Sequence, residues 1–188
     1  KIGSTLLAHG YKELTIHAED GKSLEKNALH IWPRGTYMLI ALPNFDGSFT
    51  CTLFLPFEGP LSFQSLDTSQ KAHDFFQAQF CDATPLIKDL TQTFFSNPTG
   101  NMVTVKCSPW HAYGKTLLMG DAAHAIVPFF GQGMNCGFED CTVLDECLES
   151  ELAAGTNSQV GDLASVFEKF FELRKTNADA IADMAVEN

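Results

Sequence analysis

The chain has 188 residues, of which 45% are hydrophobic and 19% charged, so it can bury a substantial core as one large or two small domains. Its formal net charge of −11 opposes binding to nucleic acid, because a polyanion would be repelled over the whole surface. No stretch approaches the ~18 consecutive apolar residues that a membrane span needs, so we expect no membrane contact from this segment.

The first part of the sequence is typical of β-structure. Tyr11–Ile16 alternates loosely between apolar and polar residues, and Ala28–Trp32 is a second apolar run, so both predict strands. Tyr37–Leu42 and Phe49–Leu55 are richer in β-branched and aromatic residues, and Asn44–Ser48 between them has the turn chemistry of a hairpin.

The hairpin also predicts which side chains share a face. Side chains alternate across a sheet, so a loop with an odd number of residues places a mostly apolar set on one side. This set comprises Met38, Ile40, Leu42, Thr50, Thr52 and Phe54.

Helical periodicity follows the hairpin. Ser69–Phe80 predicts a helix, and residues 82–95 predict one or two short ones, before a strand at Met102–Cys107. A last amphipathic helix is predicted over Val160–Lys175. The apolar positions that carry these helices are Ala72, Phe75, Phe76 and Phe80 in the first, and Val166, Phe167, Phe170, Phe171 and Leu173 in the last.

The segment between these parts is the most informative. It predicts a strand at Thr116–Met119, a tight turn at Gly120-Asp121, a glycine loop at Gly131–Gly133, and a helix from about Met134 to about Glu151. Pro128 stiffens the approach to the loop.

Each part of this segment suits one feature of a large flat cofactor. The carboxylate of Asp121 is a candidate ligand for a polyol, and the two loop glycines let the backbone approach a flat ring without a Cβ in the way. The first N–H groups of the helix lack partners within it, so they favour a partial negative charge. A Gly-Asp pair alone is equally typical of an ordinary turn.

The 21 residues from Gly120 to Asp140, GDAAHAIVPFFGQGMNCGFED, resemble the second flavin fingerprint of the FAD-dependent aromatic hydroxylases. The resemblance implies that Asp121 binds the ribityl chain of FAD. It also implies that the pyrimidine edge of the flavin lies against the loop and the helix start, which places Gly131, Gly133, Met134 and Asn135 at the cofactor.

Three longer strings resemble the branch of that family that hydroxylates L-kynurenine: AHAIVPFFGQGMN, LHIWPR at Leu29–Arg34, and FTCTLFLPF at Phe49–Phe57. This resemblance implies an aromatic small-molecule substrate, FAD as cofactor, and NADPH and dioxygen as co-substrates, with no catalytic side chain in this chain. Two alternatives stay open: another FAD-dependent hydroxylase or reductase, and a truncated module that catalyses nothing.

Two groups of residues are candidates for the substrate pocket. Pro128, Phe129, Phe130 and Gln132 form an apolar loop expected beside the flavin ring. Ile40, Leu42 and Phe54, with Leu29 as a weaker fourth, are expected to form a sheet wall over the substrate. Plain core packing is the alternative for both groups, since apolar strand faces and paired Phe residues ordinarily serve burial.

The fold expected is α/β with α+β character: an antiparallel or mixed substrate-domain sheet, then the strand-loop-helix of an FAD-binding Rossmann-like domain. We divide the chain into a substrate domain at residues 1–110, a returning part of the FAD domain at 111–150, and a helical segment at 151–188. No G-x-G-x-x-G opens a βαβ unit here, so we expect an incomplete flavin domain that is inactive alone. The resemblance implies a cytoplasmic location, or the mitochondrial outer membrane in eukaryotes.

The remaining candidate residues predict no metal site. The six cysteines form no C-x-x-C pair, and Cys136 and Cys141 are expected to be small buried side chains. His124 is expected to be a structural hydrogen-bonding residue. Glu139 and Asp140 are expected to favour the helix start electrostatically without a catalytic role.

Overall fold

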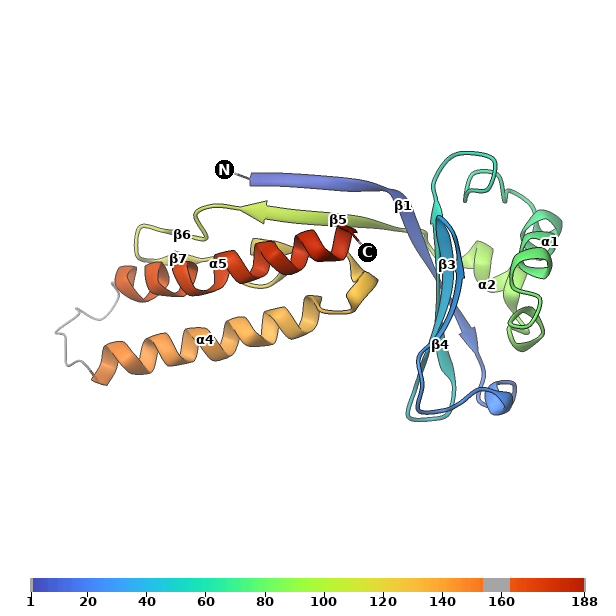
Figure 1. The fold of residues 1–188 in the computed structure, drawn as a ribbon, viewed down its shortest axis with the longest axis horizontal. Coiled ribbons are helices and arrows are strands. Elements are labelled where there is room, and N and C mark those ends of the chain that lie inside the picture. Colours follow the sequence, from blue (N-terminus) through green and yellow to red (C-terminus); the bar gives the residue numbers. More distant parts are fainter. Residues whose placement is uncertain (1, 154–162, 188) are drawn as a thin grey trace. The chain divides into compact units, whose positions relative to one another are not determined.

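The computed structural model describes residues 2–153 and 163–187, and the chain divides into two compact units (Figure 1). Unit 1 comprises Lys1–Leu6 and Val103–Asn188, and unit 2 comprises Leu7–Met102. The functional division expected at residues 110 and 150 stays a prediction, because compactness alone assigns no function.

A five-stranded sheet has the strand order β2-β3-β4-β1-β5. Antiparallel pairing joins β1 to β4, β2 to β3, and β3 to β4, as expected for strands linked by turns. The five strands are β1 (Ile2–Ile16), β2 (His30–Arg34), β3 (Tyr37–Pro43), β4 (Phe49–Pro56) and β5 (Gly100–Cys107). The predicted start of the first strand at Tyr11 is therefore wrong, because pairing with β5 extends it into a segment without clear alternation.

The predicted hairpin is confirmed in its register. Met38 pairs with Phe54, Ile40 with Thr52, and Leu42 with Thr50, so these six side chains share one face of the sheet. The opposite face, which includes Leu39, Ala41, Cys51 and Leu53, is the fully buried core of unit 2.

Helices complete the core of unit 2. The α1 helix (Ser69–Gln79) begins where the Thr68 hydroxyl accepts a hydrogen bond from the Lys71 N–H, and its Ala72 and Phe76 have no exposed surface. Aromatic rings of α1 and α2 meet, since Phe76 and Phe94 pack edge to face. The other helical elements of this unit are η1 (Gly21–Ser23), η2 (Thr84–Leu86) and α2 (Leu90–Ser96).

The predicted strand at Thr116–Met119 lies in a small two-stranded sheet of unit 1. The two-residue strands β6 (His111–Ala112) and β7 (Thr116–Leu117) pair antiparallel. The predicted strand to Met119 is therefore too long. Leu118 donates its N–H to the Trp110 carbonyl outside this ladder, and the turn at Gly120 follows at once.

Helices form most of the rest of unit 1: α3 (Asp121–His124), the short η3 (Pro128–Phe130), α4 (Gly133–Ala153) and α5 (Ala164–Glu187). In Figure 1, α4 and α5 lie side by side. No described helix is long and apolar enough to span a bilayer. The predicted last helix is confirmed from Ala164 and continues beyond Lys175. Its predicted start at Val160 lies outside the described residues.

One predicted position of the last helix is wrong. Leu173 is 51% exposed, whereas the neighbouring Arg174 is only 1% exposed and lies among the apolar residues of the buried face. A buried guanidinium requires partners for its N–H groups, and these partners lie at the candidate site.

Candidate functional site

A pocket of about 620 Å³ lies in unit 1, around the Gly120-Asp121 turn and the first turns of α4. This volume is within the range of small-molecule sites. Five predicted site residues line the pocket: Asp121, Pro128, Gly131, Gly133 and Met134. Gly120, Ile126, Gly137, Phe138 and Cys141 complete the lining.

The turn at Gly120 places a carboxylate at the rim of this pocket. Gly120 has φ +55°, a conformation that favours glycine, and its carbonyl accepts the N–H groups of Ala123 and His124 at 2.9 Å. The α3 helix therefore starts at Asp121, whose side chain is exposed. A solvent-facing carboxylate at this position can accept hydrogen bonds from hydroxyl groups of a ligand.

The loop before α4 is held by its own hydrogen bonds. Gly131 has φ +61° and closes η3 by donating its N–H to the Pro128 carbonyl at 3.0 Å. The Gln132 side chain donates to the Phe130 carbonyl at 3.0 Å and accepts from Asn135 Nδ2 at 3.1 Å. Hydrogen bonds within the segment itself thus define the shape of the loop.

The N-terminus of α4 borders the same pocket. The intrahelical ladder starts with the Cys136 N–H, which donates to the Gln132 carbonyl at 2.9 Å, so the preceding amides have no partner one turn back. A helix of 21 residues carries a positive partial charge at this end. An ideal Cβ on Gly133 would lie 4.0 Å from Asp121 Oδ1, so the helix start and the carboxylate are close neighbours.

Other predicted residues lie elsewhere. Gln132 and Asn135 line a separate pocket of about 390 Å³ between α4 and α5. Phe129 is half-buried and Phe130 is 39% exposed, and neither is among the residues that line the larger pocket.

The predicted sheet wall belongs to unit 2. Ile40, Leu42 and Phe54 share the face of the sheet opposite the core, as the register shows. Phe54 is buried, whereas Leu42 is 43% exposed and Leu29, just before β2, is 50% exposed. Ile40 and Leu42 are therefore not part of the buried core.

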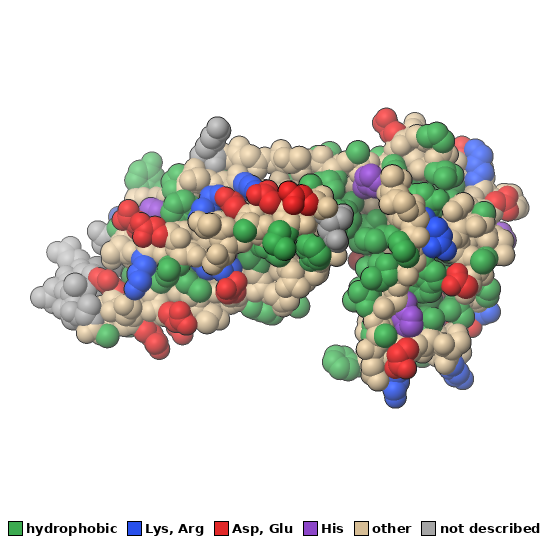
Figure 2. Space-filling view, viewed as in Figure 1, with side chains coloured by type: hydrophobic (Ala, Val, Ile, Leu, Met, Phe, Trp, Pro, Cys, Tyr) green, Lys and Arg blue, Asp and Glu red, His purple; other side chains and the backbone are tan. Residues whose placement is uncertain are grey.

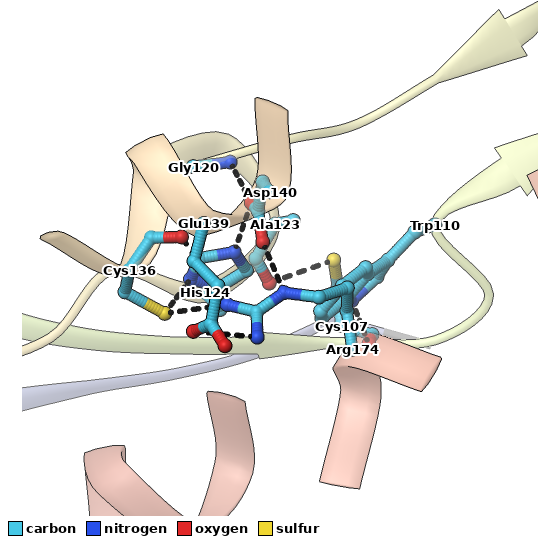
Figure 3. Close-up of polar contacts among 9 residues, drawn as sticks. All are labelled: Cys107, Trp110, Gly120, Ala123, His124, Cys136, Glu139, Asp140 and Arg174. Atoms are coloured by element: carbon cyan, nitrogen blue, oxygen red, sulfur yellow. Dashed lines mark hydrogen bonds and ion pairs between the residues drawn. The ribbon is translucent and has the colours of Figure 1, made fainter. Parts of the chain in front are cut away.

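A buried polar cluster behind the turn was not predicted from the sequence (Figure 3). Asp140 is fully buried, and its Oδ2 accepts from the Gly120 N–H at 2.8 Å and from His124 Nε2 at 2.6 Å. Its Oδ1 accepts from Arg174 Nε at 2.8 Å. Asp140 was expected to favour the start of the helix by its charge, but the first turn of α4 holds no acidic residue, and Asp140 instead lies in this buried cluster. His124 is the expected hydrogen-bonding residue.

The cluster keeps Asp140 ionised. Burial alone would raise the pKa of Asp140, but the hydrogen bonds from His124, Gly120 and Arg174 outweigh it and hold the pKa below its usual value. Arg174 also donates through Nη2 to the Cys136 carbonyl at 3.2 Å, and its Nη1 lies 2.7 Å from Glu139 Oε2. A buried cation is therefore matched by two carboxylates.

His124, Cys136 and Asp140 could in principle offer three metal ligands, because their donor atoms lie within 4.8 Å of one another. The chemistry of the cluster opposes a metal ion. Arg174 places its Nη2 3.3 Å from Cys136 Sγ, and burial raises the pKa of the Cys136 thiol, which disfavours the thiolate. The expected burial of Cys136 is confirmed, whereas Cys141 is exposed.

The geometry fits part of a flavin. The lining glycines leave open backbone for a flat ring, since a Cβ at Gly131 would meet nothing within 4 Å. The α4 N-terminus suits a developing negative charge, and Asp121 suits a hydroxylated chain.

Comparisons with known proteins agree with this geometry. Residues 70–165 match a family described as FAD binding domain. The chain is 67% identical over 184 residues to a kynurenine 3-monooxygenase of Myxococcus xanthus, covering 97% of this chain and 38% of that protein. It is 54% identical over 188 residues to a kynurenine 3-monooxygenase of Dictyostelium discoideum, covering 97% of this chain and 41% of that protein. The chain thus spans about two fifths of these relatives.

Solved structures share the fold at low sequence identity. The tetrameric form of 2-methyl-3-hydroxypyridine-5-carboxylic acid oxygenase is similar with a TM-score of 0.74 and 16% identity, covering 98% of this chain and 47% of that one. Klebsiella pneumoniae HpxO complexed with FAD is similar with a TM-score of 0.66 and 16% identity, covering 98% and 45%.

Proposed function

The chain belongs to the FAD binding domain family, and we propose that it forms part of a flavin-dependent monooxygenase that hydroxylates L-kynurenine to 3-hydroxykynurenine. The observation that carries the proposal is the pocket that joins the Asp121 carboxylate, the open glycine loop and the N-terminus of α4. The relatives' names support kynurenine as the substrate of a monooxygenase. NADPH and dioxygen are the proposed co-substrates.

Each wall of the pocket has a role in holding FAD. Asp121 accepts hydrogen bonds from the ribityl hydroxyls, and Gly131 and Gly133 let the backbone approach the isoalloxazine ring. The backbone N–H groups of Met134 and Asn135, at the start of α4, face the pyrimidine edge, where the helix dipole favours negative charge.

The chemistry of oxygen transfer is supplied by FAD when it is bound, because no protein side chain provides an electrophilic oxygen. We assign no catalytic side chain in this chain. The residues of the chain bind the cofactor, orient the substrate and exclude water from the reacting atoms.

Two groups of residues, each described within its own unit, stay candidates for contact with the substrate. In unit 1, Pro128, Phe129, Phe130 and Gln132 precede the cofactor helix and offer aromatic surface and one amide. In unit 2, the non-core sheet face offers Ile40, Leu42 and Phe54, with Leu29 beside it. The partial exposure of Ile40 and Leu42 supports this assignment over plain core packing.

The test uses the complete enzyme that contains these residues. We expect L-kynurenine to stimulate NADPH oxidation and to yield 3-hydroxykynurenine, identified by mass spectrometry. A matched control is the same enzyme stripped of FAD and then reconstituted. Turnover with other aromatic substrates but not with L-kynurenine would contradict the substrate, and no flavin-dependent oxidation of any aromatic would contradict the activity.

A further inference from the structure

The Asp140 carboxylate joins three elements of unit 1 that are far apart in the sequence. Figure 3 shows it between the turn before α3 and the guanidinium from α5. Its partner Arg174 is 34 residues away, and Gly120 is 20 residues away. Neither Asp140 nor Arg174 is among the residues that line the proposed flavin pocket.

The hydrogen bond from the Gly120 N–H to Asp140 fixes the backbone just before Asp121. Both polar groups of Gly120 are engaged: the N–H donates to Asp140 Oδ2 at 2.8 Å, and the carbonyl accepts from α3. With both ends fixed, the chain enters α3 in a set direction. The position of the Asp121 carboxylate therefore depends on Asp140.

Arg174 acts on the other wall of the pocket. Its guanidinium contacts Cys136, Glu139 and Asp140, which lie in the turns of α4 just after the helix start. The planar guanidinium of Arg174 holds the first turns of α4 against α5, because several hydrogen bonds with set directions leave the two helices little freedom to shift.

We propose that Asp140 and Arg174 are positioning residues that hold the Asp121 carboxylate and the N-terminus of α4 in the arrangement that one flavin needs. This inference rests on the proposed binding of FAD. A single rigid ligand must meet both walls at once, so a shift of either wall weakens both sets of contacts.

A double-mutant cycle on FAD affinity in the complete enzyme tests the role. Asp140→Asn keeps the shape, but its NH₂ group cannot accept from one of the present donors, which leaves a buried donor unpaired. We expect the FAD dissociation constant to rise roughly ten- to hundredfold, the range seen when residues that orient metal ligands are removed. In an Asp121→Ala background the same change should have a much smaller effect, because the group that it positions is gone.

Two further variants separate positioning from general stability. Asp179→Asn removes another acid of α5, which pairs with Lys175 of the same helix and is not among the residues that line the pocket. It should leave FAD affinity within about twofold of the parent. Arg174→Lys keeps the positive charge but lacks the several N–H donors of the guanidinium, so it should weaken FAD binding less than Asp140→Asn does. If Asp140→Asn does not fold, Arg174→Lys replaces it in the double-mutant cycle.

The outcomes are distinguishable. Parent affinity in Asp140→Asn, or an equal loss with and without Asp121, would overturn the positioning role while leaving FAD binding intact. A parent enzyme that binds no FAD would overturn the proposed function itself. Thermal unfolding of each apo variant shows that the affinities are compared among folded proteins.

Discussion

Two cysteines of α4 differ in exposure because of their place on the helix. Cys141 is exposed and lines the proposed flavin pocket, whereas Cys147, six residues later, is buried. In unit 2, Cys81 is exposed, and burial raises the pKa of Cys51 to about 12. Since the thiolate is the reactive form, the accessible thiols can report on the pocket.

We predict that FAD protects Cys141 from alkylation. In the complete enzyme treated with iodoacetamide at pH 8, FAD should slow modification of Cys141 severalfold, because the ligand covers its side of the pocket. Cys81 is the control and should react equally with and without FAD, while Cys51 stays unmodified. Peptide mass spectrometry gives each rate, and equal labelling of Cys141 in both states would place the flavin elsewhere.

At the scale of elements, two glycines of the pocket have different reasons to be glycine. Gly131 has φ +61° with open space around it, so its backbone conformation is the constraint. Gly137 lies inside α4, where an ideal Cβ would make an ordinary contact 3.9 Å from Gly120 Cα. Glycine inside a helix is less favourable than alanine. At position 137 the absence of a side chain leaves this part of the pocket lining open.

We predict opposite effects on stability from Gly137→Ala and Gly131→Ala. Gly137→Ala should raise the free energy of unfolding by roughly 0.5–1 kcal/mol, yet weaken FAD binding, because the new methyl narrows the pocket. Gly131→Ala should destabilise the protein by about 1–2 kcal/mol through its left-handed conformation. Thermal unfolding and FAD titration measure both, and unchanged FAD affinity in Gly137→Ala would show that this face of α4 does not meet the flavin.

The elements show which parts of the fold are readable from sequence. The hairpin face of Met38, Ile40 and Leu42 was predicted because side-chain alternation and loop length fix the register locally. The α5 face was predicted only in part. Position 174 falls on the buried stripe by helical spacing, but a charged residue suggests solvent unless its partner is known.

The candidate site also has a part that was predicted from the sequence and a part that was not. Its pocket residues lie within one contiguous segment, so spacing and glycine chemistry were sufficient to predict Asp121, Gly131 and Gly133 together. The bond between Asp140 and Arg174 spans 34 residues and depends on how two helices pack, which local patterns do not contain.

At the scale of the whole molecule, exposed acidic residues occur in both units of the chain. Figure 2 shows acidic side chains along the helices of unit 1. The exposed acids of α5 include Glu168 and Glu172. The pocket itself is lined by glycines and apolar residues with Asp121 as its one carboxylate. The net charge of −11 therefore bears on the choice of macromolecular partners rather than on the pocket chemistry.

The expectation that these 188 residues alone are colourless and inactive stays a prediction at this scale. Under the proposed function, the pocket described here holds the ribityl chain and the isoalloxazine ring. The pyrophosphate and adenine of FAD need a further cradle of the βαβ type, for which the sequence has no G-x-G-x-x-G.

The central claim is that Asp121 and the start of α4 form the flavin site, and FAD affinity of Asp121→Ala in the complete enzyme tests it most directly. Loss of charge-assisted hydrogen bonds to the ribityl chain should weaken binding by about 1.5–3 kcal/mol, measured by flavin fluorescence titration. Asp145→Ala, an exposed acid further along α4, is the matched control and should bind FAD as the parent does. An Asp121→Ala enzyme that retains the parent's affinity would contradict the account.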